Sequence, residues 1–290
     1  MTPDAALRAN AESLAAPFPP LLARAEHLAA TVVLGDHGRR RAGLGDTFWQ
    51  YRPALPTDDA RRIDWRRSAR SDASFVQDKE WQIAQSVSFW VDGAAAMRFS
   101  SDPAFATKAD RARLLALATA ILLLRGGERV GLLGADMPPR RGLAQAARLA
   151  EHLMSDDAAD FGAPDDRGLG AQSRAVMMSD FFGDISVVER TLARASDRGV
   201  SGVLLQVVDP QEETFPFRGR TVFESVGGTL RHETRKAGSL RDRYIAKLAE
   251  RRDRLTALAR ESGWSFGIHR TTDSATAGLM WLYQTLEGRR

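Results

Sequence analysis

The sequence predicts a doubly wound α/β domain with a mostly parallel sheet. From Ser86 onward, short apolar runs alternate with segments that have helical spacing. Strands that are apolar throughout and separated by helices are typical of a parallel sheet covered on both faces. Three of these strands end in an aspartate, namely Asp92, Asp180 and Asp209. Because such sheets carry their functional loops at the carboxyl ends of the strands, we expect these side chains at the working edge.

The individual elements follow from local patterns. Segment 108–125 is apolar at most positions and carries charge mainly near its ends, as expected of a buried helix, and segment 143–154 has apolar residues at helical spacing. Predicted strands cover 86–91, 129–134, 175–178, 200–208 and 264–269, and predicted helices cover 21–33, 108–125, 143–154, 187–198, 240–261 and 274–286. Residues 155–170 are expected as a polar loop and 211–238 as an irregular insert.

The chain is predicted to have three parts. Residues 1–38 form an N-terminal helical segment in which Pro17, Pro19 and Pro20 precede the helix. Residues 39–85 are rich in Arg, Asp and Trp and lack helical periodicity, so we expect a small β-rich appendage. Residues 86–290 form the α/β domain.

Composition narrows the class of protein. A chain of 290 residues with 43% hydrophobic and 27% charged residues resembles an ordinary soluble globular protein. The absence of cysteine excludes disulfides, thiolate metal sites and a cysteine nucleophile. The longest apolar run, 114–124, is much shorter than the ~20 residues that cross a bilayer. We therefore expect a cytoplasmic protein with no membrane span.

The charge balance allows a nucleic-acid partner but does not favour one. The net charge is +4 and the isoelectric point about 9.8, yet 41 basic residues face 37 acidic ones. A nucleic-acid site needs a concentrated basic patch, for which the candidates are Arg39-Arg40-Arg41, segment 61–70 and segment 251–254. The second of these is flanked and interrupted by aspartates, which indicates internal pairing, so a nucleic-acid site would use Arg39, Arg40 and Arg41.

Two segments carry a recognisable pattern. The first runs Gly43-x-Gly45-Asp46-x-Phe48, then Tyr51-Arg52-Pro53, then Pro56-Thr57-Asp58-Asp59-x-Arg61-Arg62-Ile63-Asp64-Trp65-Arg66-x-Ser68-Ala69-Arg70. The second is Val91-Asp92-x-Ala94-x-Ala96-Met97. Together they resemble the bacterial domain-of-unknown-function family fifty-eight, whose members join this Arg/Asp/Trp signature to a von Willebrand A-like domain. The resemblance covers roughly residues 20–290. It departs from the family pattern at Asp46, where Glu is usual, and at Thr57, where Gly is usual.

The resemblance also implies where a metal site would lie and what it lacks. A von Willebrand A metal site uses an Asp-x-Ser-x-Ser loop, a Thr from a later loop and a further Asp. Here Ala94 and Ala96 replace the two serines after Asp92, segment 138–142 offers no Thr, and Asp180 remains. Mg²⁺ requires about six oxygen ligands, so we expect a vestigial site that binds no metal. We further expect Arg140 or Arg141, near the same rim, to replace the cation's charge.

The block from Asp58 to Arg70 has two interpretations, which remain open. As a docking surface, it would use the residue types that dominate binding hot spots. As a structural staple, it would pair Asp64 with Arg62, Arg66 or Arg70 and pack Trp65 against the sheet edge. Arg–carboxylate pairs can also hold a recognition loop rigid, so the two are compatible. The residues concerned are Asp58, Asp59, Arg62, Asp64, Trp65, Arg66 and Arg70.

No enzyme or cofactor signature is present. The sequence has no P-loop, no dinucleotide fingerprint and no Gly-x-Ser-x-Gly elbow, and its five histidines lack metal-ligand spacing. The family resemblance implies a partner, a MoxR-type AAA+ ATPase. We therefore predict a non-catalytic interaction adaptor without a cofactor that acts in protein assembly or remodelling. A metal-dependent ligand-binding module and a nucleic-acid-binding protein are the alternatives, and a hydrolase ranks last.

Overall fold

A computed structural model of the protein describes residues 19–32, 42–43, 47–55, 58–69, 73–80, 84–229 and 231–288. The chain divides into two compact units, one formed by residues 1–34 with 86–290 and the other by residues 35–85. The basic cluster at Arg39, Arg40 and Arg41, the side chain of Arg62, and Arg70 lie outside the described residues. Within the described ranges, no helix is long and apolar enough to cross a lipid bilayer.

A six-stranded sheet forms the centre of the larger unit. Its strand order is β11-β8-β7-β4-β5-β6, and all neighbours are parallel except β5 and β6. The mixed α/β architecture with a mostly parallel sheet is thus confirmed. The strands are β4 (Ser86–Val91), β5 (Arg129–Leu132), β6 (Met137–Arg140), β7 (Arg174–Ser179), β8 (Ser201–Val208) and β11 (Ser265–Arg270).

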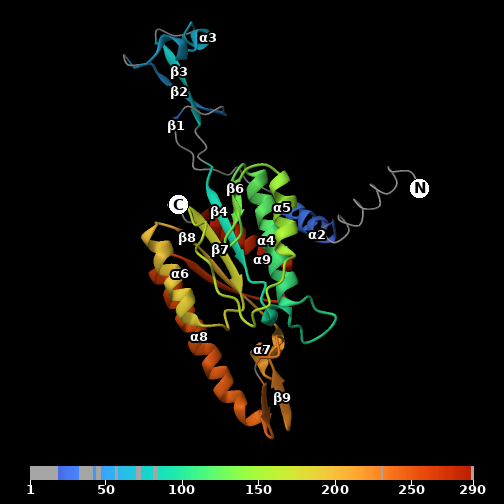
Figure 1. Ribbon diagram of the computed structural model, residues 1–290. Helices are drawn as coiled ribbons and strands as arrows, with labels where there is room; N and C mark the ends of the chain where they lie inside the picture. Colours follow the sequence, from blue (N-terminus) through green and yellow to red (C-terminus); the bar gives the residue numbers. More distant parts are fainter. Residues whose placement is uncertain are drawn as a thin grey trace, which may run out of the picture. The chain divides into compact units, whose positions relative to one another are not determined.

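Two hydrophobic cores lie on opposite faces of this sheet. In β7, Val176 and Met178 belong to one core while Ala175 and Met177 belong to the other, as the alternation of side chains along a strand requires. Helices on both faces complete the cores (Figure 1). The first core contains residues of α2 (Pro19–Ala30), α4 (Lys108–Arg125), α5 (Ala144–Leu153) and α9 (Ala275–Gly288), and the second contains residues of α6 (Ile185–Asp197) and α8 (Arg241–Glu261).

The helix near the N-terminus belongs to the larger unit. Leu21, Ala25, Leu28 and Ala29 of α2 are buried in the same core as α4. Their spacing places them on one face of the helix. From the sequence, residues 1–38 were expected to be separate from the α/β domain. The buried apolar face of α2 instead makes this helix part of the α/β domain.

Several elements lie where none was predicted. The 211–238 insert contains nearly all of α7 (Pro210–Thr214), the hairpin of β9 (Thr221–Glu224) and β10 (Arg231–Thr234), and the first half of η3 (Ala237–Leu240). Strand β6 has the sequence Met-Pro-Pro-Arg, and its two prolines disfavour a strand because proline has no backbone N–H to donate. It is tolerated because β6 lies at the edge of the sheet. Gly131 allows this approach, since a Cβ there would lie 2.6 Å from the carbonyl oxygen of Met137.

The direction of β6 corrects one prediction. Because β6 runs antiparallel to β5, Met137 is opposite Leu132 while Arg140 is opposite Val130. Arg140 therefore lies toward the amino-terminal end of β5, away from the carboxyl edge where Asp92 is found, and Arg141 follows it. The expectation that Arg140 or Arg141 supplies positive charge beside Asp92 is wrong.

The smaller unit is built on an antiparallel sheet of order β1-β3-β2. The strands are β1 (Ala42–Gly43), β2 (Thr47–Pro53) and β3 (Phe75–Glu80), with η1 (Ala60–Arg62) and α3 (Trp65–Ser68) between the last two. Ser68 ties α3 to β3, because its hydroxyl accepts a hydrogen bond from the Phe75 backbone N–H at 2.8 Å. The Asp64 N–H also donates to the Phe75 carbonyl at 2.9 Å. These two bonds connect the Asp58–Arg70 block to β3 through Asp64 and Ser68.

Candidate functional site

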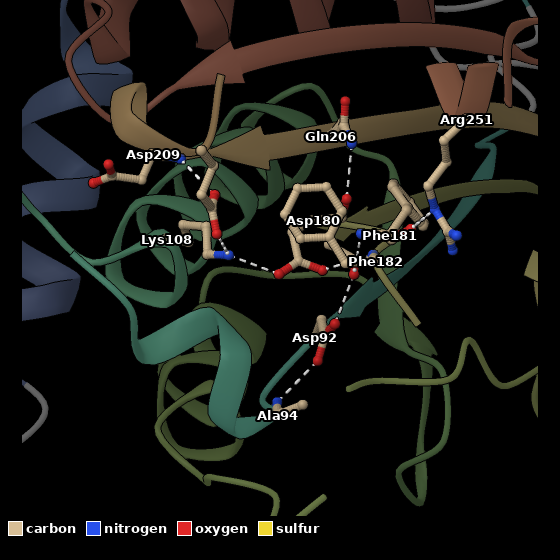
Figure 2. A network of polar contacts seen from close by, with 11 residues as sticks. Asp92, Ala94, Lys108, Asp180, Phe181, Phe182, Gln206, Asp209 and Arg251 are labelled. Carbon is tan, nitrogen blue, oxygen red and sulfur yellow. Dashed lines mark hydrogen bonds and ion pairs between the residues drawn. The ribbon is translucent and has the colours of Figure 1, made fainter. Parts of the chain in front are cut away.

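Three aspartates meet the carboxyl edge of the central sheet, as the sequence indicated. Asp92 follows β4, Asp180 follows β7 and Asp209 follows β8, and each is at most 2% exposed (Figure 2). Asp209 serves as a helix cap, because its carboxylate accepts the backbone N–H of Gln211 at the start of α7. Its other oxygen accepts the N–H of Ser101 at 2.9 Å. Asp209 thus joins two loops.

A buried lysine holds the second aspartate. Lys108 begins α4, and its Nζ donates to Oδ2 of Asp180 at 2.7 Å and to Oε1 of Glu212 at 2.6 Å. The side chain of Lys108 is 1% exposed. Glu212 lies in α7, where its other oxygen accepts the backbone N–H of Asp209 at 2.9 Å and completes a capping box. The ammonium therefore connects α4, the β7 loop and α7.

The charges of this cluster depend on one another. Burial alone lowers the pKa of Lys108, but the nearby carboxylates of Asp180 and Glu212 outweigh it, so the pKa is raised. Burial raises the pKa of Glu212, although Lys108 opposes that effect. The rings of Phe99 and Phe182 add cation–π contacts, with their centroids 5.9 and 5.2 Å from the ammonium. Lys108 is accordingly cationic at neutral pH.

Asp92 is closed off from solvent. Its Oδ1 accepts the Ala94 N–H at 2.8 Å, and its Oδ2 accepts the Ser179 hydroxyl at 2.6 Å. Gly162 covers the carboxylate so closely that a Cβ on that residue would lie 2.1 Å from Oδ1. Burial raises the pKa of Asp92 above its usual range.

The loop that carries Gly162 pairs with the loop after β4. The N–H groups of Ala95 and Ala96 donate to the carbonyls of Ala159 and Asp160 at 2.8 and 2.9 Å. Ala94 is fully buried and Ala96 is partly buried beneath this contact. The polar segment 155–170 is thus a cover over the strand-end loop.

These residues do not fit a divalent metal. Both oxygens of Asp92 accept hydrogen bonds. Both oxygens of Asp180 also accept: Oδ2 from Lys108, and Oδ1 from the Phe182 N–H at 2.9 Å. Across the described part of the chain, no three His, Asp or Glu side chains gather to hold an ion. The positive charge at this edge comes from Lys108, which sequence reasoning missed. The available signal was a lysine opening a helix that is apolar on nearly every side.

A second row of side chains fixes the loop after β7. Gln206 donates from Nε2 to the Asp180 carbonyl at 2.8 Å and accepts Nε of Arg252 at 2.9 Å. Arg251 donates to the Phe181 carbonyl (Figure 2). It also donates to the Gly183 carbonyl. Phe181 has a φ of 53°, a left-handed conformation that is uncommon outside glycine. These bonds hold that conformation and thereby keep Phe182 against the ammonium.

An aromatic pocket adjoins the ammonium. It has a volume of about 230 Å³, and Lys108, Asp180 and Glu212 belong to its lining. We call it the aromatic pocket; its rings come from Phe99, Phe161, Phe182, Phe215, Phe217, Phe223 and Tyr244. The Phe215 ring contacts those of Tyr244 and Phe217, with centroids 4.8 and 5.2 Å apart. No sequence pattern marks this pocket, because its rings come from widely separated segments.

In the smaller unit, Asp58 forms a buried ion pair. Its two oxygens accept NH1 and NH2 of Arg52 at 2.6 and 2.7 Å, and Oδ2 also accepts the Leu55 N–H at 2.7 Å. The Asp58 side chain is only 7% exposed. This partner lies in β2, outside the basic block. Asp59 caps η1 by accepting the Arg61 N–H at 3.0 Å.

Asp64 is held by the backbone and a tyrosine. Its Oδ1 accepts the N–H groups of Arg66 and Arg67 at 3.1 Å, and its Oδ2 accepts the Tyr51 hydroxyl at 2.9 Å. Hydrogen bonds from the Arg67 backbone and the Tyr51 hydroxyl lower the pKa of Asp64. Of the arginines expected beside it, Arg66 supplies its N–H rather than an ion pair. The expected Asp64–Arg66 side-chain pair is replaced by a helix N-cap.

Trp65 differs from the staple interpretation. It is the first residue of α3 and is 61% exposed, so it does not pack against the sheet edge. Arg66 beside it is exposed as well. Arg67 instead lies over the Tyr51 ring, with its guanidinium carbon 4.4 Å from the ring centroid. Asp64, Tyr51 and Arg67 thus hold the short helix while Trp65 faces outward.

Comparison with known proteins identifies the family of this sequence. The family described as "Protein of unknown function DUF58" matches residues 50–254. The chain belongs to this family. The DUF58 match runs from β2 into α8, so it includes the Asp58–Arg66 residues and the Lys108–Asp180–Glu212 cluster.

Relatives of this DUF58 chain occur in mycobacteria. Uncharacterized proteins of Mycobacterium bovis and Mycobacterium tuberculosis are each 27% identical over 238 residues, covering 76% of this chain and 73% of theirs. Among solved structures, the conserved hypothetical protein BatB from Bacteroides thetaiotaomicron aligns with 71% of this chain and 98% of its own, at 13% identity and a TM-score of 0.41. An aerotolerance-related membrane protein from Bacteroides fragilis aligns with 71% of this chain and 100% of its own, at 14% identity and a TM-score of 0.43.

Proposed function

We propose that this DUF58 protein is a non-catalytic interaction adaptor whose smaller unit docks a MoxR-type AAA+ ATPase. The observation that carries the proposal is the exposed Trp65 on a helix held by Asp64. Tryptophan and arginine are the residues most enriched in binding hot spots, and Trp65 is followed by the exposed Arg66. The identity of the partner rests on the resemblance of the Arg/Asp/Trp signature.

The rigid support of Trp65 favours a binding role. Asp64 caps the helix that carries it, Ser68 ties that helix to β3, and Asp58 holds the preceding turn through Arg52. Immobilising a side chain on binding costs roughly 0.5–1.5 kcal/mol, and a scaffold that is already ordered reduces the backbone part of such costs. A large aromatic residue presented to solvent on such a scaffold suits recognition.

The larger unit, in this proposal, is a von Willebrand A-like domain that works without a metal. The mostly parallel sheet, the helices on both faces, and the aspartates after β4 and β7 support the likeness. The Lys108 ammonium supports the absence of a metal, because it binds Asp180 directly. The same ammonium counts against the alternative of a metal-dependent ligand-binding module.

Binding to the host's own MoxR-type ATPase tests the proposal. We expect the purified full-length chain to bind the ATPase and Trp65→Ala to weaken the complex at least about tenfold, as for a hot-spot residue. Met280→Ala, which also removes an exposed apolar side chain but from α9, is the matched control and should bind like the wild type. Circular dichroism and thermal unfolding establish that both variants are folded. Equal affinity of Trp65→Ala and wild type would overturn the docking role.

A further inference from the structure

Most rings of the aromatic pocket keep part of their surface exposed. Phe215 is buried, and the partly exposed rings are those of Phe99, Phe161, Phe182, Phe217, Phe223 and Tyr244. Phe215 joins three of them, because its ring lies against those of Phe217, Phe223 and Tyr244. A concave, mainly apolar surface with a few polar groups in its wall is typical of a ligand site.

The pocket has room for a small organic molecule. Its volume is about 230 Å³, whereas a cavity of about 150 Å³ accepts benzene. By volume, the aromatic pocket therefore holds a ligand about one and a half times the size of benzene. A ligand of that size would contact several of the rings at once.

The charged groups in the wall of the pocket are mainly negative. Among its described lining residues, Asp180, Glu212 and Glu224 are acidic and Lys108 is basic. Asp180 and Glu212 are ionised, because all four of their carboxylate oxygens accept hydrogen bonds from N–H groups. Lys108 balances one of these two charges, and the exposed Glu224 adds another at the rim. The wall therefore favours a positively charged ligand.

The hydroxyl of Tyr244 responds to the same field. Burial raises its pKa, and the negative charges of Glu212, Asp180 and Glu213 raise that pKa further. Arg252 opposes this effect on the pKa only in part. The surroundings of this ring thus disfavour an additional negative charge and favour a positive one.

The wall also selects the kind of cation. A primary ammonium needs acceptors for three N–H groups, but each carboxylate oxygen of Asp180 and Glu212 already accepts a bond. A quaternary ammonium donates no hydrogen bond, and aromatic rings attract it through cation–π contacts. Phe99 and Phe182 already make such contacts with the ammonium of Lys108, at 5.9 and 5.2 Å. The rings therefore suit an alkylated nitrogen better than a primary amine.

From this combination of rings and charge, we propose that the aromatic pocket binds a quaternary ammonium group of a small organic cation. The alkylated nitrogen lies among the rings, and the carboxylates of the wall attract it. Lys108 keeps Asp180 in place beneath them (Figure 2). The site belongs to the larger unit and is separate from the Trp65 surface. It goes beyond the proposed function, since it does not depend on an ATPase partner.

Isothermal titration calorimetry on the full-length chain tests the proposal with three probes. Choline carries the quaternary nitrogen, 3,3-dimethylbutanol is its uncharged isostere, and ethanolamine is its primary-ammonium counterpart. We expect choline to bind in the submillimolar to millimolar range. Each of the other two probes should bind at least about fivefold more weakly, because one lacks the cation–π attraction and the other lacks the methyl groups that pack against the rings.

Variants of the chain locate the probe. Phe217→Leu removes one ring of the pocket and should weaken choline binding about threefold or more, with little effect on the uncharged isostere. Its matched control is Phe105→Leu, which removes a ring that is 37% exposed outside the pocket. Glu224→Gln removes the charge at the rim and should weaken choline binding about twofold, whereas Glu151→Gln on α5 should not.

A modified peptide distinguishes the two sources of such a group. A short peptide with one trimethyllysine that binds as tightly as choline or more tightly would identify a side chain of a partner polypeptide as the ligand. Weaker binding of that peptide would identify a free small molecule. Both results support a quaternary ammonium site.

Other outcomes would overturn the site. These are absence of choline binding at millimolar concentration, equal binding of the uncharged isostere, and equal effects of Phe217→Leu and Phe105→Leu. Trp65→Ala should leave choline binding unchanged. Choline binding that survives when ATPase binding fails would refute only the docking role of Trp65, and the converse would refute only the pocket.

Discussion

The ammonium of Lys108 lies 2.7 Å from Oδ2 of Asp180, and neither side chain is more than 2% exposed. This pair joins the first residue of α4 to the loop after β7 at the carboxyl edge of the sheet. The same ammonium also binds Glu212 of α7. A single ammonium thus bridges two carboxylates that come from different elements.

Removing that ammonium should destabilise the fold. Lys108→Met keeps a long apolar side chain but leaves Asp180 and Glu212 without their cation. Breaking one partner of a buried pair costs roughly 3–5 kcal/mol of unfolding free energy, which urea denaturation measures. Lys247→Met, on the exposed face of α8, is the control and should change stability by less than about 0.5 kcal/mol. A loss below about 1 kcal/mol for Lys108→Met would show that the pair contributes little.

The same position should control the response to divalent cations. We expect no heat and no thermal shift when Mg²⁺ or Mn²⁺ is added to the wild type, since Lys108 binds Asp180. In Lys108→Ala the carboxylates are released, and 10 mM Mn²⁺ binding with a Kd of about 1 mM would restore about 1.4 kcal/mol, or a Tm increase of roughly 2–4 °C. The double variant Lys108→Ala with Glu212→Gln should lose this increase. An equal Tm increase in the wild type would show that the ion binds at another site than Asp180 and Glu212.

Gly162 should tolerate no side chain. A Cβ there would lie 2.1 Å from Oδ1 of Asp92, so the 155–170 cover must move away from the strand-end loop. Overpacking of this kind typically costs 1–3 kcal/mol, and we expect Gly162→Ala to lower the Tm by several degrees. Gly238→Ala is the control, because a Cβ at Gly238 meets no atom within 4 Å. A Gly162→Ala Tm equal to that of the control would mean that the cover is loose.

Acid should destabilise the protein through a buried histidine. His269 in β11 is 4% exposed, and burial together with the neighbouring Arg111 lowers its pKa to about 4. Because the unfolded chain binds this proton near pH 6.5 and the folded chain does not, stability is lost as the pH falls from about 6.5 toward 4. The full loss is about 3 kcal/mol.

Urea unfolding at pH 7.0 and 5.0 measures this effect, and the His269→Gln variant separates it from the titration of other groups. We expect the wild type to lose more stability between these values than His269→Gln does. His152→Gln, which changes an exposed histidine of α5, should behave like the wild type. If the unfolding free energies of wild type and His269→Gln change equally with pH, the acid sensitivity does not come from His269.

Much of the fold is readable from local patterns, whereas the site is not. The 108–125 helix and the strand-end positions of Asp92, Asp180 and Asp209 were predictable because both depend on residues close in sequence. The Lys108 contacts to Asp180 and Glu212 join residues 72 and 104 positions apart, and no local pattern encodes them. The misplacement of Arg140 has a similar origin, because the reversal of β6 follows from edge pairing that its two prolines obscure.

In the smaller unit, too, the sequence indicates which segment matters but not which residues pair within it. The sequence marked the Asp58–Arg70 block as important but assigned the acids arginine partners within that block. Asp58 pairs with Arg52 of the preceding strand, and Asp64 uses backbone N–H groups and the Tyr51 hydroxyl. Partner choice there depends on the fold of the hairpin, which residue types alone do not determine.

A cation carried on the chain differs from a bound ion in one lasting respect. An ion equilibrates with the medium, so its occupancy follows the free concentration and a chelator can empty the site. The ammonium of Lys108 is attached covalently, so every folded copy contains one, and neither starvation nor chelation can remove it. The positive charge at this edge of the sheet is therefore independent of the metal content of the medium.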